Sequence, residues 1–212
     1  MTKRGATEFF VLDERQRAAF VRACDNLTER IVVKVPLFAG LRVSELAHMH
    51  YGWVTRLSGR GRGGLSIPPR EACDCSECAN DPQHPGLWMP KSKAAVRVVP
   101  IVPALVKDLE ELFTLNPKGL RNAKRERLSR YSIHHLIQRI GERAGIRYPG
   151  GGTVFPHALR ATFASMLAEQ GFTAPQICYL CGWSSLAVAQ KYINRSEAMR
   201  GAQRRMQDLD IG

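Results

Sequence analysis

The stretch VFPHALRATFASMLAEQGFTAPQICYLCGWSSLAVAQKYIN, residues 154–194, decides how the chain is interpreted. It contains four side chains that can contact a phosphate group: His157, Arg160, Trp183 and Tyr192. His157 and Arg160 lie three positions apart at the head of a run with apolar residues at helical spacing, so a helix would present both on one face. Trp183 follows a glycine that can end a helix, and Tyr192 is expected on a short helix after it.

An upstream segment offers a second arginine. In FAGLRVSELAHM, residues 38–49, Arg42 and Glu45 are three positions apart on a predicted helix whose other face is apolar. The Glu45 carboxylate can therefore hold the Arg42 guanidinium in one rotamer. Taken alone, such a pair is more often an ordinary salt bridge within a helix.

The residues from Trp53 to Ile101 change to a pattern of short strands and turns. Val96 and Val98 alternate with Arg97, which predicts a half-buried strand, and LWMP precedes it across the tight connection KSKAA. We therefore expect Lys91 and Lys93 at or near the tip of a hairpin. Lysines are common there as solubilising residues.

Most of the remaining chain has helical periodicity. Helices are predicted over 13–24, with Asp13 as N-cap, over 28–39, with Pro36 kinking or ending the helix, over 103–113 and over 132–146. A further short helix is expected in the tail, 196–212. The predicted fold class is mainly α with one small antiparallel β-sheet, in an α+β arrangement.

Composition narrows the class of partner. The 212 residues include 31 Lys and Arg against 19 Asp and Glu, a net charge of +12, which favours a polyanion such as nucleic acid. The basic clusters 56–62 and 118–130 are candidate loops for contacts with a phosphate backbone. No apolar run approaches the roughly 18 residues of a membrane span, and residues 1–10 lack a signal-peptide core, so we expect a globular intracellular protein.

The residue types also narrow the chemistry. A two-metal nuclease needs clustered carboxylates, and a hydrolase with a nucleophile elbow needs GxSxG; the sequence shows neither. Two arginines, a lysine, a histidine, a tryptophan and a tyrosine suit phosphoryl transfer without a metal, because guanidinium groups neutralise the charge that develops on a phosphodiester. Tyr192 would be the nucleophile, and its phenol, with an ordinary pKa of about 10, needs a base or positive potential to attack at neutral pH.

Three segments resemble the motifs of tyrosine recombinases, the phage integrase family, in their expected order. These are LFAGLRVSEL, PHALRATFAS and CGWSSLAVAQKYI, and the lysine of PKSKAAVRVVPI fits as a fourth element. The resemblance covers residues 10–195 and implies the catalytic-domain fold of that family. It also implies site-specific DNA recombination through a 3′-phosphotyrosine intermediate, without a metal or ATP.

The resemblance assigns roles to individual residues. It implies that Arg42 and Arg160 clamp the scissile phosphate, with Glu45 supporting Arg42, and that His157 accepts or positions a proton. Trp183 would donate one hydrogen bond and pack against the site. Tyr192 would form the covalent link. A lysine would protonate the 5′-oxygen leaving group, and its expected place at the start of the turn favours Lys93 over Lys91.

The family pattern also sets expectations for domains and partners. We expect a lead-in over 1–12, a catalytic domain over 13–195, a tail helix over 196–212, and no room for the family's N-terminal DNA-clamping domain. Double-stranded DNA and assembly into a tetramer on DNA are the implied partners, inside a prokaryotic host. A type IB topoisomerase-like enzyme and a non-catalytic DNA-binding module remain alternatives.

A Cys-rich insertion, residues 68–86, departs from these motifs. Cys73, Cys75, Cys78 and His84 give the spacing C-x-C-x2-C-x5-H, which provides enough ligands for a structural zinc ion. Free thiols in a loop are the alternative. The other cysteines, Cys24, Cys178 and Cys181, are expected in the core. His48, His50, His134 and His135 lack a metal-binding spacing, and we expect surface or core roles for them.

Overall fold

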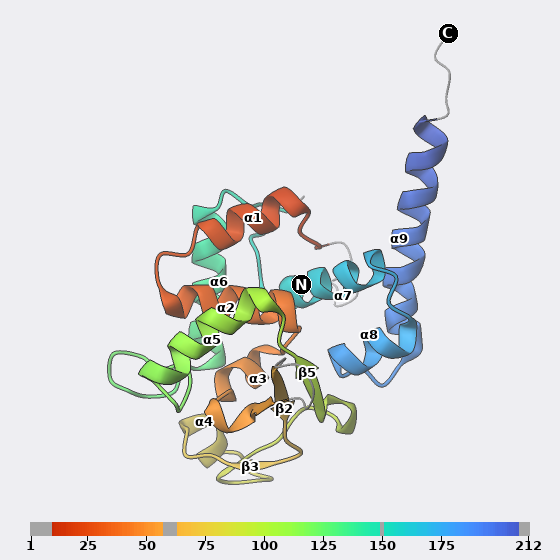
Figure 1. Cartoon of the computed structure of the whole chain (residues 1–212). Coiled ribbons are helices and arrows are strands. Elements are labelled where there is room, and N and C mark those ends of the chain that lie inside the picture. Colours follow the sequence, from red (N-terminus) through yellow and green to blue (C-terminus); the bar gives the residue numbers. More distant parts are fainter. Residues whose placement is uncertain (1–9, 57–62, 149–150, 208–212) are drawn as a thin grey trace.

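The computed structural model describes residues 10–56, 63–148 and 151–207 (Figure 1). The longer helices in these residues are α1 (Glu14–Arg22), α2 (Leu27–Ala39), α5 (Pro103–Leu115), α6 (Arg130–Arg143), α7 (Pro156–Glu169), α8 (Ala174–Cys181) and α9 (Leu186–Gln207). The segment between α2 and α5, which contains the strands, also forms two short helices, α3 (Val43–His48) and α4 (Ser76–Ala79), and the 3-10 turns η2 (Tyr51–Trp53) and η3 (Lys93–Ala95). The mainly helical fold class is confirmed.

The helix ends follow the local chemistry of the sequence. Asp13 caps α1 and Asn26 caps α2, each by accepting a hydrogen bond from a backbone N–H in the first turn. Pro36 does not end α2, which continues to Ala39 and stops at Gly40, whose φ of 60° is in the left-handed region that glycine adopts easily. The long helices predicted from periodicity are thus present, with ends that shift by a few residues.

The strands form two antiparallel sheets in place of the single sheet that we expected. One has the order β1 (Val54–Arg56), β2 (Gly63–Ile67), β5 (Arg97–Pro100), and the other pairs β3 (Glu71–Ala72) with β4 (Leu87–Trp88). The predicted hairpin between LWMP and AVRVVPI is therefore wrong, because β4 and β5 pair with different partners. Lys91 and Lys93 lie in the connection that crosses from one sheet to the other.

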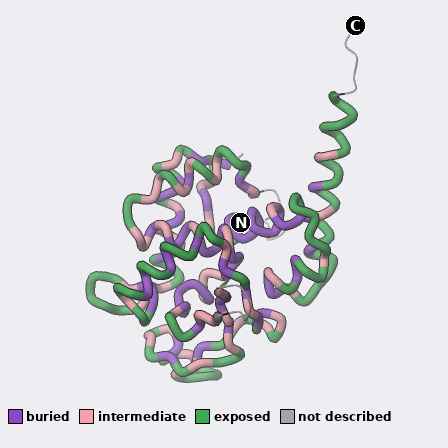
Figure 2. The backbone as a smooth tube through the Cα atoms, viewed as in Figure 1, coloured by how far each residue is buried: buried purple, intermediate pink, exposed green. Residues whose placement is uncertain are grey.

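Helix α2 is the centre of the core. It packs against α5, α6 and α7, and its apolar side chains are almost all buried (Figure 2). The sheet of β1, β2 and β5 closes the same core through Leu65, Ile67 and Val99. A second apolar cluster joins α7, α8 and the start of α9, and it includes Cys178, Cys181 and Tyr192.

Helix α9 runs without a break from Leu186 to Gln207 and extends away from the rest of the fold (Figure 1). We expected a short helix around Tyr192 and a separate tail helix over 196–212; a single helix spans both as far as the structure describes them. Its residues 201–207 are all exposed. Among the helices described, none is both long and apolar enough to cross a membrane.

Candidate active site

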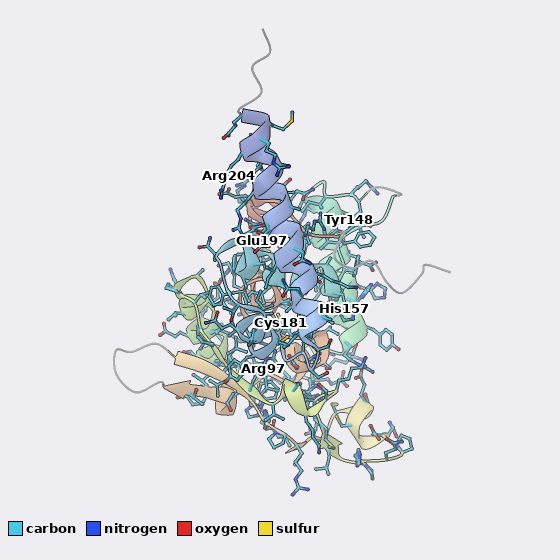
Figure 3. All side chains as sticks on the ribbon, turned by 90° about the vertical axis from the view of Figure 1, so that its right-hand side faces the viewer. Arg97, Tyr148, His157, Cys181, Glu197 and Arg204 are labelled. Carbon is cyan, nitrogen blue, oxygen red and sulfur yellow. The ribbon has the colours of Figure 1, made fainter. Side chains whose placement is uncertain are left out.

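A pocket of about 570 Å³ forms where the starts of α3 and α7 meet the turn between α8 and α9. Five side chains of the types expected in the site line this pocket: Arg42, Lys91, His157, Arg160 and Trp183. These residues come from segments up to 141 positions apart, so the fold brings together what the sequence keeps separate. Figure 3 shows His157 and Cys181 near the lower end of α9, with Arg97 below them.

Arg42 precedes α3 as its N-cap residue. Its Nη1 donates to Glu45 Oε1 at 2.8 Å, and its Nη2 donates to the carbonyl of Gly182 at 2.7 Å. The predicted pair of Arg42 and Glu45 is therefore present, and a second contact fixes the guanidinium against the α8–α9 turn. The side chain is still partly accessible at the pocket wall.

Glu45 has a further partner that the sequence interpretation missed. Arg97 on β5 points inward and donates from Nη1 and Nη2 to the two carboxylate oxygens of Glu45, each at 3.1 Å. The alternation of valines with Arg97 predicted a buried valine face, but Val96 is 39% exposed and Arg97 is 4% exposed. Burial alone would raise the pKa of Glu45, but the charge and hydrogen bonds of Arg97, with the charge of Arg160, hold it below its ordinary value.

Arg160 is buried at the base of the pocket. Its Nη1 donates to the carbonyl of Gly40, and its guanidinium carbon lies 5.6 Å from the centroid of the Trp183 ring. Its Nη2 is buried without a hydrogen-bond partner among the described residues. Desolvation, with the charge of Arg42, lowers the pKa of Arg160 to about 10, which leaves it a cation at neutral pH. An anion in the pocket would supply the partner that Nη2 lacks.

His157 lies in the first turn of α7, directly after Pro156, and lines the pocket. Desolvation of the ring and the positive charges of Arg160, Lys91 and Arg42 lower its pKa below the ordinary value. The imidazole is therefore neutral at pH 7 and can accept a proton.

Lys91 lines the pocket, whereas Lys93 begins η3 outside the lining. We expected Lys93 to be the lysine of the site because the family resemblance places that lysine at the start of the turn. Since β4 and β5 do not pair, the turn differs from the expected hairpin. Lys91 lines the same pocket as His157, and its positive charge acts on that ring.

Trp183 and Tyr192 stack on each other with ring centroids 5.5 Å apart and planes 18° from parallel. Gly182, with a φ of 58°, ends α8 and turns the chain so that Trp183 faces the pocket. A Cβ at Gly182 would lie 2.9 Å from Ala95 Cα and from Arg97 Nη1, so this close approach needs glycine. Tyr192 is 7% exposed and lies behind Trp183 rather than on the pocket lining.

A second group of candidate site residues, with side chains of metal-ligand type, lies away from this pocket. Cys73, Cys75 and Cys78 converge with His48, and their ligand atoms all lie within 4.8 Å of one another. His84, which the spacing suggested as the fourth member, is exposed and outside this group. His48 comes from α3, 25 positions before Cys73, so a local spacing pattern could not reveal it. Cys178 and Cys181 are buried core residues, as expected.

Comparisons with known proteins show the family to which the chain belongs. Residues 87–199, more than half of the chain, match the model of the phage integrase family. The chain belongs to the phage integrase family. Family membership and the fold of the catalytic domain, both expected from the motifs, are confirmed.

Curated relatives of this family member are tyrosine recombinases. "Tyrosine recombinase XerA" of Thermococcus onnurineus is 35% identical over 149 residues, which are 66% of this chain and 51% of that protein. "Tyrosine recombinase XerD" of Xanthomonas axonopodis pv. citri is 29% identical over 192 residues, 85% of this chain and 57% of the relative. The integrase-family chain thus spans about half the length of the curated relatives that it matches.

Solved structures share its fold. The crystal structure of XerA recombinase superposes with a TM-score of 0.69 at 21% identity, covering 97% of this chain and 66% of the other. The Tn1549 transposon integrase in complex with transposon right end DNA gives a TM-score of 0.67 at 16% identity, covering 91% and 66%. At these identities the likeness concerns the fold.

Proposed function

We propose that this chain cleaves and rejoins double-stranded DNA at specific sites through a 3′-phosphotyrosine intermediate. Tyr192 Oη forms a bond to the scissile phosphorus, the bond from phosphorus to the 5′-oxygen breaks, and the departing oxygen takes a proton from Lys91. His157 accepts or positions the phenol proton. One phosphodiester replaces another, so the exchange needs no energy source.

The Nη2 of Arg160, which has no partner in the part of the chain that the structure describes, is the observation that carries this proposal. A buried guanidinium nitrogen without a partner is costly, and a phosphate oxygen in the pocket would satisfy it. Arg42 lines the same pocket with its position fixed by Glu45 and Gly182. Two guanidinium groups that converge on one small pocket suit the charge of a phosphodiester in its transition state.

Tyr192 must approach the pocket before it can attack. Its ring is buried against Trp183, and it follows six residues after the start of α9. We propose that the first turns of α9 shift on DNA so that Oη reaches the phosphate. This shift would rearrange the contact between the rings of Tyr192 and Trp183.

Assembly belongs to the same proposal. The exposed end of α9 carries Met199, 54% exposed, and Met206, 67% exposed, on a helix that extends beyond the fold. An exposed apolar surface on a projecting helix suits contact with another protein copy. We propose that four copies assemble on DNA and that α9 takes part in their contacts.

The cationic side chains of the pocket lining suit a reaction that uses no metal. The pocket lining contains no carboxylate among the described residues, so arginine and lysine would supply the positive charge there. Any metal bound by the cysteine group would have a structural role. A topoisomerase-like reaction uses similar chemistry on one duplex without partner exchange, and joint molecules between two DNA duplexes would distinguish recombination from it.

Covalent trapping tests the proposed function. The chain is mixed with supercoiled plasmid in buffer without magnesium, quenched with SDS, and analysed for protein-linked nicked DNA. Wild type should give an adduct and Tyr192→Phe none, while both bind DNA equally. An adduct of equal yield from Tyr192→Phe, or equal plasmid nicking without any covalent protein, would contradict a tyrosine nucleophile.

A further inference from the structure

We propose that His48, Cys73, Cys75 and Cys78 bind one zinc ion, which fastens the Cys-rich insertion to α3. This site is separate from the pocket of Arg42 and Arg160, and its existence does not depend on the proposed DNA reaction.

The distances within the group suit a tetrahedral metal site. His48 Nε2 lies 3.4 Å from Cys78 Sγ and 3.6 Å from Cys75 Sγ, and Cys73 Sγ completes a set whose members all lie within 4.8 Å of one another. Zinc bonds of about 2.3 Å to sulfur and about 2.0 Å to nitrogen give tetrahedral edges of roughly 3.5 to 3.8 Å. The two His48 distances already match these edges, and no edge needs to contract by more than about 1.3 Å.

The imidazole of His48 is already oriented as a ligand. Its Nδ1 lies 2.8 Å from the carbonyl oxygen of Ser44, one helical turn earlier, so Nδ1 carries the proton and Nε2 faces the thiols. Metal-binding histidines commonly have such a backbone partner on the second nitrogen. The indole of Trp88 stacks on the imidazole at 5.2 Å and limits its rotation.

The backbone of the insertion closes around the thiols. Cys73 N–H donates to the carbonyl of Gly86, and Gly86 N–H donates to the carbonyl of Cys78, each at 2.9 Å. Cys75 precedes α4 as its N-cap residue, which brings Cys78 back toward Cys75 after one turn. The segment forms a loop with all three sulfur atoms on its inner side, as a structural metal site requires.

Burial and ligand type favour zinc in a structural role. Cys73, Cys78 and His48 are each less than 9% exposed, Cys75 is half-buried, and four protein ligands leave no coordination position for a substrate. Thiolate and imidazole ligands select zinc over calcium or magnesium, which prefer oxygen. The sheet of β3 and β4 has only two paired residues per strand, so strand pairing contributes little to holding this polar segment in place.

The proposed zinc site would also affect the pocket of Arg42 and Lys91, and this effect rests on the proposed function. Glu45 and His48 lie on the same six-residue helix, α3, so one end contacts Arg42 and the other contacts the thiols. Strand β4 ends at Trp88, three positions before Lys91. A bound zinc would thus hold the segment that leads to Lys91 against the helix that supports Arg42.

Metal content tests the site. The chain is purified without chelators from cells supplied with zinc, and zinc per chain is measured by mass spectrometry for wild type, His48→Ala and His84→Ala. Wild type and His84→Ala should each hold one zinc per chain. His48→Ala should bind zinc at least on the order of 100-fold more weakly in competition with a chromophoric chelator, because it removes a direct ligand. His84 is a matched control because it lies in the same insertion but outside the group.

Cobalt and thiol measurements give readouts that do not depend on whether a variant folds. Wild type loaded with cobalt should show thiolate charge-transfer bands and intense tetrahedral d–d bands, and chelator should abolish them. Three outcomes would each overturn the proposal. They are less than one zinc per chain in wild type, an equal loss of zinc binding in His84→Ala and His48→Ala, and a disulfide among the three thiols under native reducing conditions. Zinc binding can be present in a chain that forms no DNA adduct, so failure of the two proposals is distinguishable.

Discussion

Arg97 and Glu45 form a buried ion pair with two parallel contacts, although 52 positions separate them in the sequence. Both guanidinium-to-carboxylate distances are 3.1 Å, and both side chains are at most 1% exposed. Glu45 Oε1 also accepts from Arg42. Strand β5 therefore determines where Glu45 lies, and Glu45 in turn determines where Arg42 lies at the pocket wall.

Replacing Arg97 should cost both stability and activity. Arg97→Met keeps most of the side-chain volume but removes the charge that compensates Glu45 and leaves a buried carboxylate under-paired. We expect a loss of about 3 to 5 kcal/mol in the free energy of unfolding, measured with urea, and a lower rate of adduct formation. Arg139→Met, at an exposed position of α6, is the control and should change neither quantity. Equal stability of the two variants would show that the buried pair contributes little.

Removing either clamp arginine should abolish most cleavage. Arg42→Ala and Arg160→Ala each take away a partner for the charge of the transition state, so adduct formation should fall by about 10²-fold or more. Arg160→Lys keeps the charge but loses the second nitrogen of the fork, and we expect it to fall well below wild type as well. The measurement is the initial rate of adduct formation at saturating DNA. A rate near wild type for either alanine variant would exclude that residue from the clamp.

The choice between the two lysines can be tested through the leaving group. A DNA strand with sulfur in place of the bridging 5′-oxygen releases a thiolate, which leaves without protonation far more readily than an alkoxide. Lys91→Ala should therefore cleave ordinary DNA poorly and cleave the sulfur-containing strand at close to the wild-type rate. Lys93→Ala, two positions away and outside the pocket lining, is the control and should behave like wild type on both strands. The reverse pattern would assign the role to Lys93.

Trp183 should act mainly as a packing surface between two partners. Its ring stacks on Tyr192 and lies under the guanidinium of Arg160, contacts worth about 1 kcal/mol each. Trp183→Ala removes both and should lower the adduct rate by roughly tenfold or more. Trp183→Phe keeps an aromatic face and isolates the indole N–H. A loss with Trp183→Phe as large as with Trp183→Ala would show that the hydrogen bond to phosphate, and not packing, is what matters.

Much of the fold could be predicted from local patterns, and the motifs contain most of the side chains that the structure gathers around the pocket. Apolar spacing located the long helices, and the Arg42 and Glu45 pair is present because a separation of three residues on a helix turn places the two side chains together. Alternation in AVRVVPI correctly indicated a strand but not which face is buried. An arginine faces the core there because Glu45 compensates its charge, and that partner lies 52 positions away.

The differences between expectation and structure concern pairing between distant segments. Strand β4 pairs with β3 instead of β5, and this changes which lysine reaches the pocket. His48 joins the three cysteines because α3 packs next to the insertion, whereas the spacing favoured His84. Local periodicity contains no information on such pairings, since they depend on which surfaces the whole chain buries together.

The protonation of His157 provides a test that needs no DNA. Desolvation and the charges of Arg160, Lys91 and Arg42 lower its pKa, so its carbon-13 NMR signal should titrate below the ordinary value near 6.5. The folded state then binds fewer protons than the unfolded chain. Its contribution to stability is therefore fully present above the unfolded pKa and is lost as pH falls through the folded pKa.

Because positive charge is one cause of this shift, Lys91→Ala should raise the pKa of His157 toward the ordinary value and Lys93→Ala should leave it unchanged. His157→Asn identifies the signal among the six histidines. If neutral His157 accepts the phenol proton, the rate of adduct formation should fall as pH drops through the pKa that it has on DNA, which the phosphate charge raises. A pKa in the free chain at or above 6.5, or one that Lys91→Ala does not move, would contradict the placement of Lys91 beside His157.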